Sequence, residues 1–226
     1  MTQGRPRIAI VGGTGALGSA LAKRWIQADY CVFIGSRDVA KAEQVARALQ
    51  ASERTEPARG MLNRDAARQG DIVVVTVPYA SQTAILEDIK AEVHGKIVLD
   101  TTVPLVPPRV ARVQLPPQGS AALVAREVLG ENVSLVSGFH NVAAHKLQAD
   151  EPVACDVLLF GDDVNARDAV AQLVAAAGLR AIHGGPLQNS VAAEAMTSVL
   201  ININRRYKVE GAGIRITAIP GDEPIP

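Results

Sequence analysis

The feature of this sequence that most restricts the fold is a short apolar strand leading directly into a glycine-rich turn. Residues Arg7–Val11 precede the pattern Gly13-Thr14-Gly15-Ala16-Leu17-Gly18, and an apolar-periodic stretch follows over Ala20–Ala28. A G-x-G-x-x-G pattern is informative when it joins a strand to a helix at the head of a βαβ unit. There the glycines permit the tight turn, the approach of a pyrophosphate and close helix packing. We therefore predict a dinucleotide site at this turn; a structural turn without a ligand is the alternative.

Strand-like and helix-like segments alternate along most of the chain. The expected strands are Arg7–Val11, Cys31–Gly35, a short one ending near Met61, Ile72–Val77, Lys96–Asp100, Val133–Phe139, Asp156–Gly161 and Arg180–His183. The expected helices are Ala20–Ala28, Val39–Leu49, Asn63–Gln69, Ser81–Val93, Ser120–Leu129, Asn165–Ala177 and Asn189–Arg206. This alternation is typical of right-handed βαβ crossovers and predicts an α/β fold with a Rossmann-type, doubly wound, mostly parallel sheet. We assign residues 1–184 to it and residues 185–226 to a small C-terminal helical appendage.

The end of the second expected strand indicates which dinucleotide is bound. NAD-binding proteins commonly place an acidic residue there to bind the ribose 2′-hydroxyl. This chain has Ser36 and Arg37 instead, with Lys41 one helical turn further on, and a guanidinium suits a 2′-phosphate. Asp38 follows Arg37 and is expected to cap the next helix. The pattern favours NADP, against the alternative of solvated cations at a helix start.

Two further strand ends carry polar residues that we expect to face the cofactor. Thr76, Val77 and Pro78 lie at the C-terminal end of the fourth strand, and Thr102 and Val103 follow the fifth. Ligands of open α/β sheets bind outside the carboxyl ends of the strands. Turn formation is the alternative explanation for these residues.

Composition excludes several other classes of protein. The 226-residue chain carries 23 basic and 23 acidic residues, a balance that argues against a nucleic-acid binder. No stretch approaches the roughly 20 continuous apolar residues of a membrane span. Cys31 and Cys155 lie in apolar runs and are expected to be buried thiols, not a disulfide. Together with the absence of a signal-peptide pattern, this predicts a cytoplasmic protein.

The sequence lacks the usual signs of a side-chain catalyst. Tyr207 is not followed by a lysine four residues later, as in the Tyr-x-x-x-Lys pair of short-chain dehydrogenases, and no metal-ligand cluster is present. His140 ends an expected strand on the ligand side, where it is either a ring contact or a structural residue. If the substrate is itself a hydride carrier, orientation of two rings is sufficient, and no acid or base is needed.

These motifs together resemble the NADPH-dependent reductases of coenzyme F420, also called F420H2:NADP oxidoreductases. The resemblance runs in order from about residue 7 to residue 206. It is carried by the segments Val11–Gly18, Gly35–Arg37, Thr76–Pro78, Val136–His140, Phe160–Asp163 and Gly185–Ser190. It implies that Thr14, Ser36, Arg37 and Lys41 hold the 2′-phosphate. It also implies that the deazaflavin stacks on the nicotinamide near His140, Asn141 and Val142, while Leu187, Asn189 and Ser190 close the pocket.

The resemblance implies hydride transfer between deazaflavin C5 and nicotinamide C4 without a side-chain acid. Arg205, Arg206, Lys208 and Arg215 form a cationic stretch that could meet the anionic tail of the deazaflavin, or could simply be solvated. The helix over Val191–Ile203 has an apolar face that we expect to pack in a homodimer. The alternatives are an NADPH-dependent reductase of another acceptor, such as a flavin, a ferric chelate or an imine, and an NADP-binding redox sensor.

Overall fold

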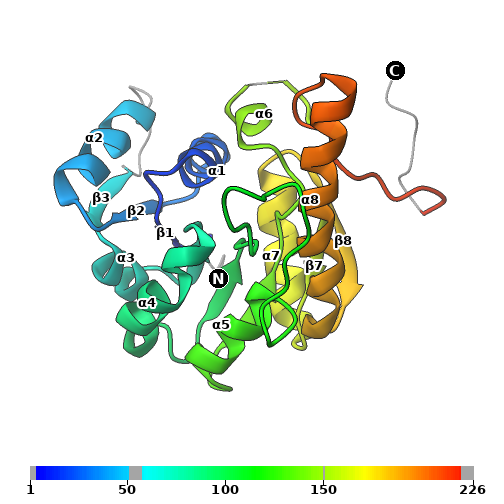
Figure 1. Ribbon diagram of the computed structural model, residues 1–226. Helices are drawn as coiled ribbons and strands as arrows, with labels where there is room; N and C mark the ends of the chain where they lie inside the picture. Colours follow the sequence, from blue (N-terminus) through cyan, green and yellow to red (C-terminus); the bar gives the residue numbers. More distant parts are fainter. Residues whose placement is uncertain (1–3, 51–57, 150, 220–226) are drawn as a thin grey trace.

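The computed structural model describes residues 4–50, 58–149 and 151–219, in which eight strands form one twisted sheet (Figure 1). The strands are β1 (Ile8–Val11), β2 (Val32–Ser36), β3 (Arg59–Leu62), β4 (Ile72–Val75), β5 (Ile97–Asp100), β6 (Ser134–Ser137), β7 (Asp156–Phe160) and β8 (Arg180–Gly185). They lie in the order β3-β2-β1-β4-β5-β6-β7-β8. The chain therefore winds outward in both directions from β1, and the predicted doubly wound α/β fold is confirmed.

Helices cover both faces of this sheet. They are α1 (Ala16–Gln27), α2 (Val39–Leu49), α3 (Asn63–Gln69), α4 (Tyr79–Ile89), α5 (Ala121–Leu129), α6 (Ala144–Gln148), α7 (Val164–Ala176) and α8 (Ser190–Tyr207), with 3₁₀ turns η1 (Lys90–Glu92) and η2 (Leu187–Asn189). One apolar cluster joins α1, α2 and α7 to the sheet, and a second joins α3, α4 and α5. The central strands are buried on both sides, which explains their continuous β-branched runs. None of the described helices is long and apolar enough to cross a bilayer.

Most helix and strand bounds agree with the sequence within a few residues. The first helix starts at Ala16, four residues earlier than expected, because it follows the glycine turn without a linker. The expected helix over Ser81–Val93 begins instead at Tyr79, directly after Pro78, and ends in η1. The short helix α6 was not predicted. It packs against α1, whose Lys23 and Arg24 side chains donate to carbonyls at its end.

The sheet departs from parallel pairing at one place. β6 and β7 are antiparallel and share a single pair of residues, Ser137 and Phe160, while β7 and β8 are parallel to each other. The sheet is thus mostly parallel, as predicted, and this one antiparallel pair arises because the connection after β6 stays at the carboxyl edge and contains only α6. β7 therefore begins beyond that edge and runs back toward it.

The segment after α8 returns to the sheet. The Asp156 backbone N–H donates to the Ile214 carbonyl at 2.7 Å, and the Asp156 carboxylate accepts from the Ile216 N–H at 2.6 Å. The same carboxylate forms an ion pair of 2.7 Å with Arg180, which also donates to the Ile216 carbonyl. The appendage predicted from residue 185 is thus tied back to β7 and β8. The division at residue 184, one residue before β8 ends, stays a prediction.

Candidate functional site

The glycine turn between β1 and α1 is built by close backbone contacts. Gly12 has a φ of +77°, and the Gly13 N–H donates to the Gly35 carbonyl at 2.9 Å. A Cβ on Gly18 would lie 2.6 Å from Thr76 Oγ1 and 2.7 Å from Gly13 Cα, so α1 approaches β4 only because residue 18 is glycine. Gly15 is the N-cap of α1, and no side chain caps the first turn. A helix N-terminus of this kind suits an anion.

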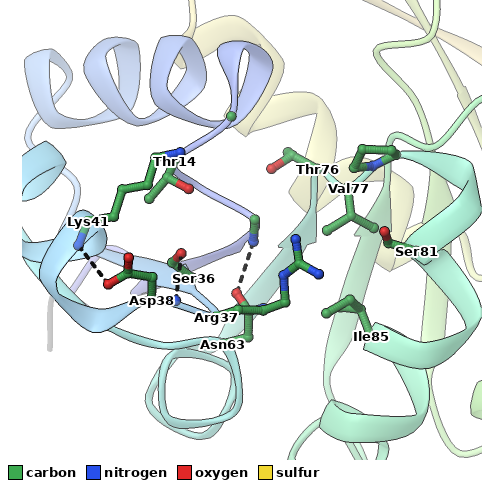
Figure 2. A pocket seen from close by; sticks show the side chains of 13 residues that line it. Thr14, Ser36, Arg37, Asp38, Lys41, Asn63, Thr76, Val77, Ser81 and Ile85 are labelled. Atoms are coloured by element: carbon green, nitrogen blue, oxygen red, sulfur yellow. Dashed lines mark hydrogen bonds between the residues drawn. The ribbon is translucent and has the colours of Figure 1, made fainter.

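A cavity of about 490 Å³ opens beside this turn; we call it the turn cavity. Among its lining residues are eight predicted cofactor-binding residues, namely Thr14, Gly15, Ser36, Arg37, Lys41, Thr76, Val77 and Pro78. Figure 2 shows these side chains converging from the ends of β1, β2 and β4. Gly13 and Gly18 support the turn from behind and do not line the cavity. The structure therefore brings together residues up to 64 positions apart.

The two cations of the turn cavity stand at the start of α2. Asp38 caps this helix, as predicted, by accepting from the Lys41 N–H at 3.2 Å, and its own N–H donates to Ser36 Oγ at 3.1 Å. The carboxylate is thereby engaged with the helix. Arg37 and Lys41 remain exposed at the mouth of the cavity, where an anionic ligand can reach them.

A second cavity of about 400 Å³ continues from the first; we call it the strand-end cavity. The two share Gly15, Thr76, Val77 and Pro78. The strand-end cavity is also lined by the predicted residues Ala16, Leu17, Thr102, Val103, His140 and Val142, and by Tyr79, Thr101, Leu105, Phe139 and Thr197. A continuous trench therefore runs from the glycine turn, across the ends of β4 and β5, to β6 and α8.

His140 lies at the far end of this trench. Its side chain is buried, and burial lowers the pKa of the imidazole to about 3, so the ring is neutral near pH 7. Nε2 lies 2.8 Å from Ser137 Oγ, and the His140 carbonyl accepts from Thr197 Oγ1. The preceding residue, Phe139, adopts a φ of +64° and packs edge-on against Trp25. This uncommon backbone conformation orients the loop that carries the histidine.

The other predicted substrate residues occupy different positions. Asn141 donates from Nδ2 to the Ala193 carbonyl at 2.9 Å and lines a smaller cavity of about 160 Å³ that shares His140 and Val142 with the strand-end cavity. Leu187, Asn189 and Ser190 lie outside these cavities. Leu187 is in the core, Asn189 donates to the Gly184 carbonyl, and Ser190 bonds Ser120 Oγ. They anchor the start of α8, and their contact with a substrate stays a prediction.

A buried polar network beneath the strand-end cavity was not predicted. Asp100, at the end of β5, accepts from the Thr102 N–H and hydroxyl and from Gln82 Nε2, and burial raises its pKa to about 6. Glu194 of α8 accepts from the Ala121 N–H at 2.6 Å and from the next N–H of α5 at 3.1 Å. Burial, with a contribution from Asp100, raises the pKa of Glu194 to about 7. This network holds α8 and the Thr102 loop against the sheet.

Two other predictions concern metals and cysteines. Within residues 4–50, 58–149 and 151–219, no group of three or more His, Cys, Asp and Glu side chains is arranged to hold a metal ion. Cys31 and Cys155 form no disulfide. The groups of the trench that can contact a ligand are therefore those of the glycine turn, the two cations, the strand-end hydroxyls and the neutral histidine.

Comparison with known proteins agrees with this geometry. Residues 7–104 match the family model described as NADP oxidoreductase coenzyme F420-dependent. The F420-dependent NADP reductase of Methanocaldococcus jannaschii is 39% identical, over 93% of this chain and 98% of the relative. The protein of the same name from Methanothermobacter thermautotrophicus is 37% identical, over 96% and 97%.

Solved structures show the same fold. An Arthrobacter sp. FB24 protein, described as a candidate F420-dependent NADP reductase, superposes with a TM-score of 0.79 at 22% identity, over 94% of this chain and all of that one. An imine reductase from Myxococcus stipitatus superposes with a TM-score of 0.61 at 21% identity, over 90% of this chain and 62% of the larger protein. The two sequence relatives match this chain over nearly its whole length and theirs. The chain therefore belongs to the family of coenzyme F420-dependent NADP oxidoreductases.

Proposed function

We propose that this protein transfers a hydride between NADP(H) and the deazaflavin coenzyme F420. The relatives above are named for this activity. The observation that carries the proposal is the continuous trench, which begins at a glycine turn flanked by two cations and ends at a neutral histidine beside α8. Such a trench has room for a dinucleotide and a second ring system in line.

The turn cavity is our proposed site for the adenosine end of NADP. The first turn of α1 would receive the pyrophosphate, as the uncapped N-terminus favours. Arg37 and Lys41, with the hydroxyls of Thr14 and Ser36, would hold the 2′-phosphate. The exposure of Arg37 and Lys41 at one end of the cavity supports this assignment.

The strand-end cavity would hold the two reacting rings. We place the nicotinamide against Thr76, Val77 and Pro78 and the loop of Thr102 and Val103, with the deazaflavin stacked on it beside His140 and Val142. Asn141, together with Leu187 and Asn189 of η2 and Ser190 at the start of α8, would keep that wall in place through their contacts. Much of the cavity lining is apolar, which suits flat ring systems.

Hydride transfer in this site depends on apposition of the rings. With both rings bound there, NADPH would supply a hydride from C4 to deazaflavin C5, and solvent would supply the proton that completes the reduction. His140 does not act as the acid, because its imidazole is neutral across the physiological range. Proximity and orientation therefore supply the rate enhancement.

We also propose a homodimer, formed through the exposed apolar side chains of α8. Met196 and Val199 of that helix are 38% and 41% exposed, whereas Leu200 is buried within its own chain. The cationic stretch, which begins with Arg205 and Arg206 in the last turn of α8, would face the anionic tail of F420. A cytoplasmic location remains part of the proposal.

The test is an activity assay with NADPH and oxidised F420, followed by the loss of deazaflavin absorbance. Arg37→Ala should weaken NADPH binding about tenfold, the lower end of a charge-assisted contact, and leave NADH binding nearly unchanged. Arg47→Ala, which removes the same charge from the far part of α2, is the matched control. Equal losses for NADPH and NADH would contradict the 2′-phosphate assignment. Tight NADPH binding without F420 turnover would contradict the proposed acceptor.

A further inference from the structure

Asn63 is a buried polar residue in the turn cavity to which neither the sequence motifs nor the family comparison gives a role. It directly follows β3 as the first residue of α3, and the last pair of the β2–β3 ladder, Ser36 with Leu62, places it beside the end of β2. Only 4% of the residue is exposed, yet it lines the turn cavity together with Arg37 and Ser36. Its exposed part therefore faces the proposed ligand site.

One end of the Asn63 side chain holds the glycine turn. Oδ1 accepts the Gly12 N–H at 3.1 Å, across 51 residues of sequence (Figure 2). Gly35 of β2 makes room for this contact, because a Cβ there would lie 2.9 Å from Asn63 Oδ1 and 3.1 Å from Asn63 Cα. The backbone N–H can only donate, so the carbonyl end of the amide must face Gly12. The orientation of the amide is thereby determined.

The other end of the amide is the Nδ2 donor. Nδ2 forms no hydrogen bond with the described residues, and it is not enclosed in the core. A buried side-chain amide normally uses its donors, since an unused donor costs free energy. A donor held in fixed orientation, next to a serine hydroxyl and a guanidinium, is suited to a ligand that offers oxygen or nitrogen acceptors.

We propose that Asn63 is a binding residue for the adenosine 2′-phosphate part of NADP: Oδ1 positions the glycine turn while Nδ2 donates to the nucleotide. This inference rests on the proposed placement of the adenosine end in the turn cavity. The Asn63 side chain then links the conformation of the glycine turn to ligand binding in the turn cavity. The group that this contact would recognise is a nucleoside carrying a phosphomonoester, and the nicotinamide takes no part in the contact.

The experiment separates the two ends of the amide. Asn63→Asp keeps an oxygen for the Gly12 N–H and removes the donor, whereas Asn63→Ala removes both. Adenosine 2′,5′-bisphosphate is the probe, and its affinity is measured by calorimetry in 0.1 M and 1 M salt, with thermal unfolding of each protein recorded without ligand. Asn132→Asp, the same change at an exposed position before β6, is the matched control. High salt screens the long-range part of the repulsion between an introduced carboxylate and the phosphates.

We expect Asn63→Asp to unfold at nearly the wild-type temperature and to bind the probe at least about tenfold more weakly, with the loss persisting in 1 M salt. Asn63→Ala should lose both stability and affinity. Asn63→Asp binding the probe within about twofold of wild type in 1 M salt would overturn the ligand role and leave only the turn contact. Failure of the wild-type protein to bind the probe would instead overturn the cavity assignment itself.

A measurement on the wild-type protein serves if the variants do not fold. The side-chain ¹⁵N–H₂ signals of Asn63 should move when the probe is added, because one of their protons enters a new hydrogen bond. The Asn132 signals should stay in place. Unchanged Asn63 signals at saturating probe would overturn the proposal.

Discussion

Replacing Glu194 by glutamine tests whether burial or hydrogen bonding controls the ionisation of this carboxyl. The side chain is 1% exposed, which favours the protonated form, but it also accepts two N–H groups at the start of α5, which favours the charged form. Burial prevails and raises the pKa from 4.5 to about 7. At 1.36 kcal/mol per pH unit this difference amounts to about 3 kcal/mol of unfolding free energy.

The sign of this pH dependence follows from whether the folded or the unfolded protein binds more protons. Between pH 4.5 and about 7 the folded protein holds a proton on Glu194 that the unfolded chain releases, so this residue makes stability fall as pH rises. His140 acts in the opposite direction below pH 6.5, because its folded pKa is lowered to about 3. Asp100, raised to about 6, adds to the effect of Glu194. The pH dependence of the wild-type unfolding free energy therefore contains contributions from all three groups. The difference in unfolding free energy between the variant and wild type reports the contribution of Glu194.

The assay is urea unfolding of wild type and Glu194→Gln at pH 5, 6, 7 and 8. Relative to wild type, the variant should gain about 2.5 kcal/mol of unfolding free energy between pH 5 and pH 8, most of it before pH 7.5. Glu87→Gln, at an exposed position of α4, controls for loss of one negative charge. A difference that stays flat across this range would refute the argument from burial. A variant that loses relative stability as pH rises would show that the α5 N–H groups dominate.

Two other perturbations test the frame of the site. Gly18→Ala places a Cβ 2.6 Å from Thr76 Oγ1, so it should cost about 1–3 kcal/mol of stability and weaken NADPH binding. Thermal unfolding measures the stability, and calorimetry measures the binding. Gly4→Ala, which has open space around its Cβ, should change neither quantity. Asp156→Asn removes the charge that holds Arg180 and the returning tail, and should cost about 2 kcal/mol, since Arg180 is partly exposed. Trypsin should then cleave after Arg215 faster than in wild type, and an unchanged cleavage rate would show that the ion pair does not secure the tail.

Sequence patterns predicted those parts of the fold that depend on neighbouring residues. The glycine turn, the capping role of Asp38 and the long helix α8 each have a signal within a few positions. The predicted cofactor residues of β1, β2 and β4 also meet in one cavity, because parallel strands end at the same edge.

The remaining site residues were missed because their partners are distant in sequence. Asn63 starts a short helix and looks like an ordinary helix-start residue, yet its partner Gly12 is 51 positions away. Glu194 looks like a solvated helix residue, and its partner Ala121 is 73 positions away. The reversal at β6 and β7 has no local signal either, since strands of both directions share the same apolar pattern. Only the folded chain brings these contacts together.

The single residue pair between β6 and β7 has a consequence for how such a protein can change over evolutionary time. Everything assigned to the dinucleotide's adenosine end lies in the part of the chain from β1 to the start of α4, whereas α8 and the β7–β8 ladder lie on the other side of that narrow seam. Substitutions and insertions beyond the seam leave the hydrogen-bond ladder of the nucleotide-binding strands intact. A lineage can therefore vary the part of the chain beyond β6 while keeping the strands to which the dinucleotide is assigned.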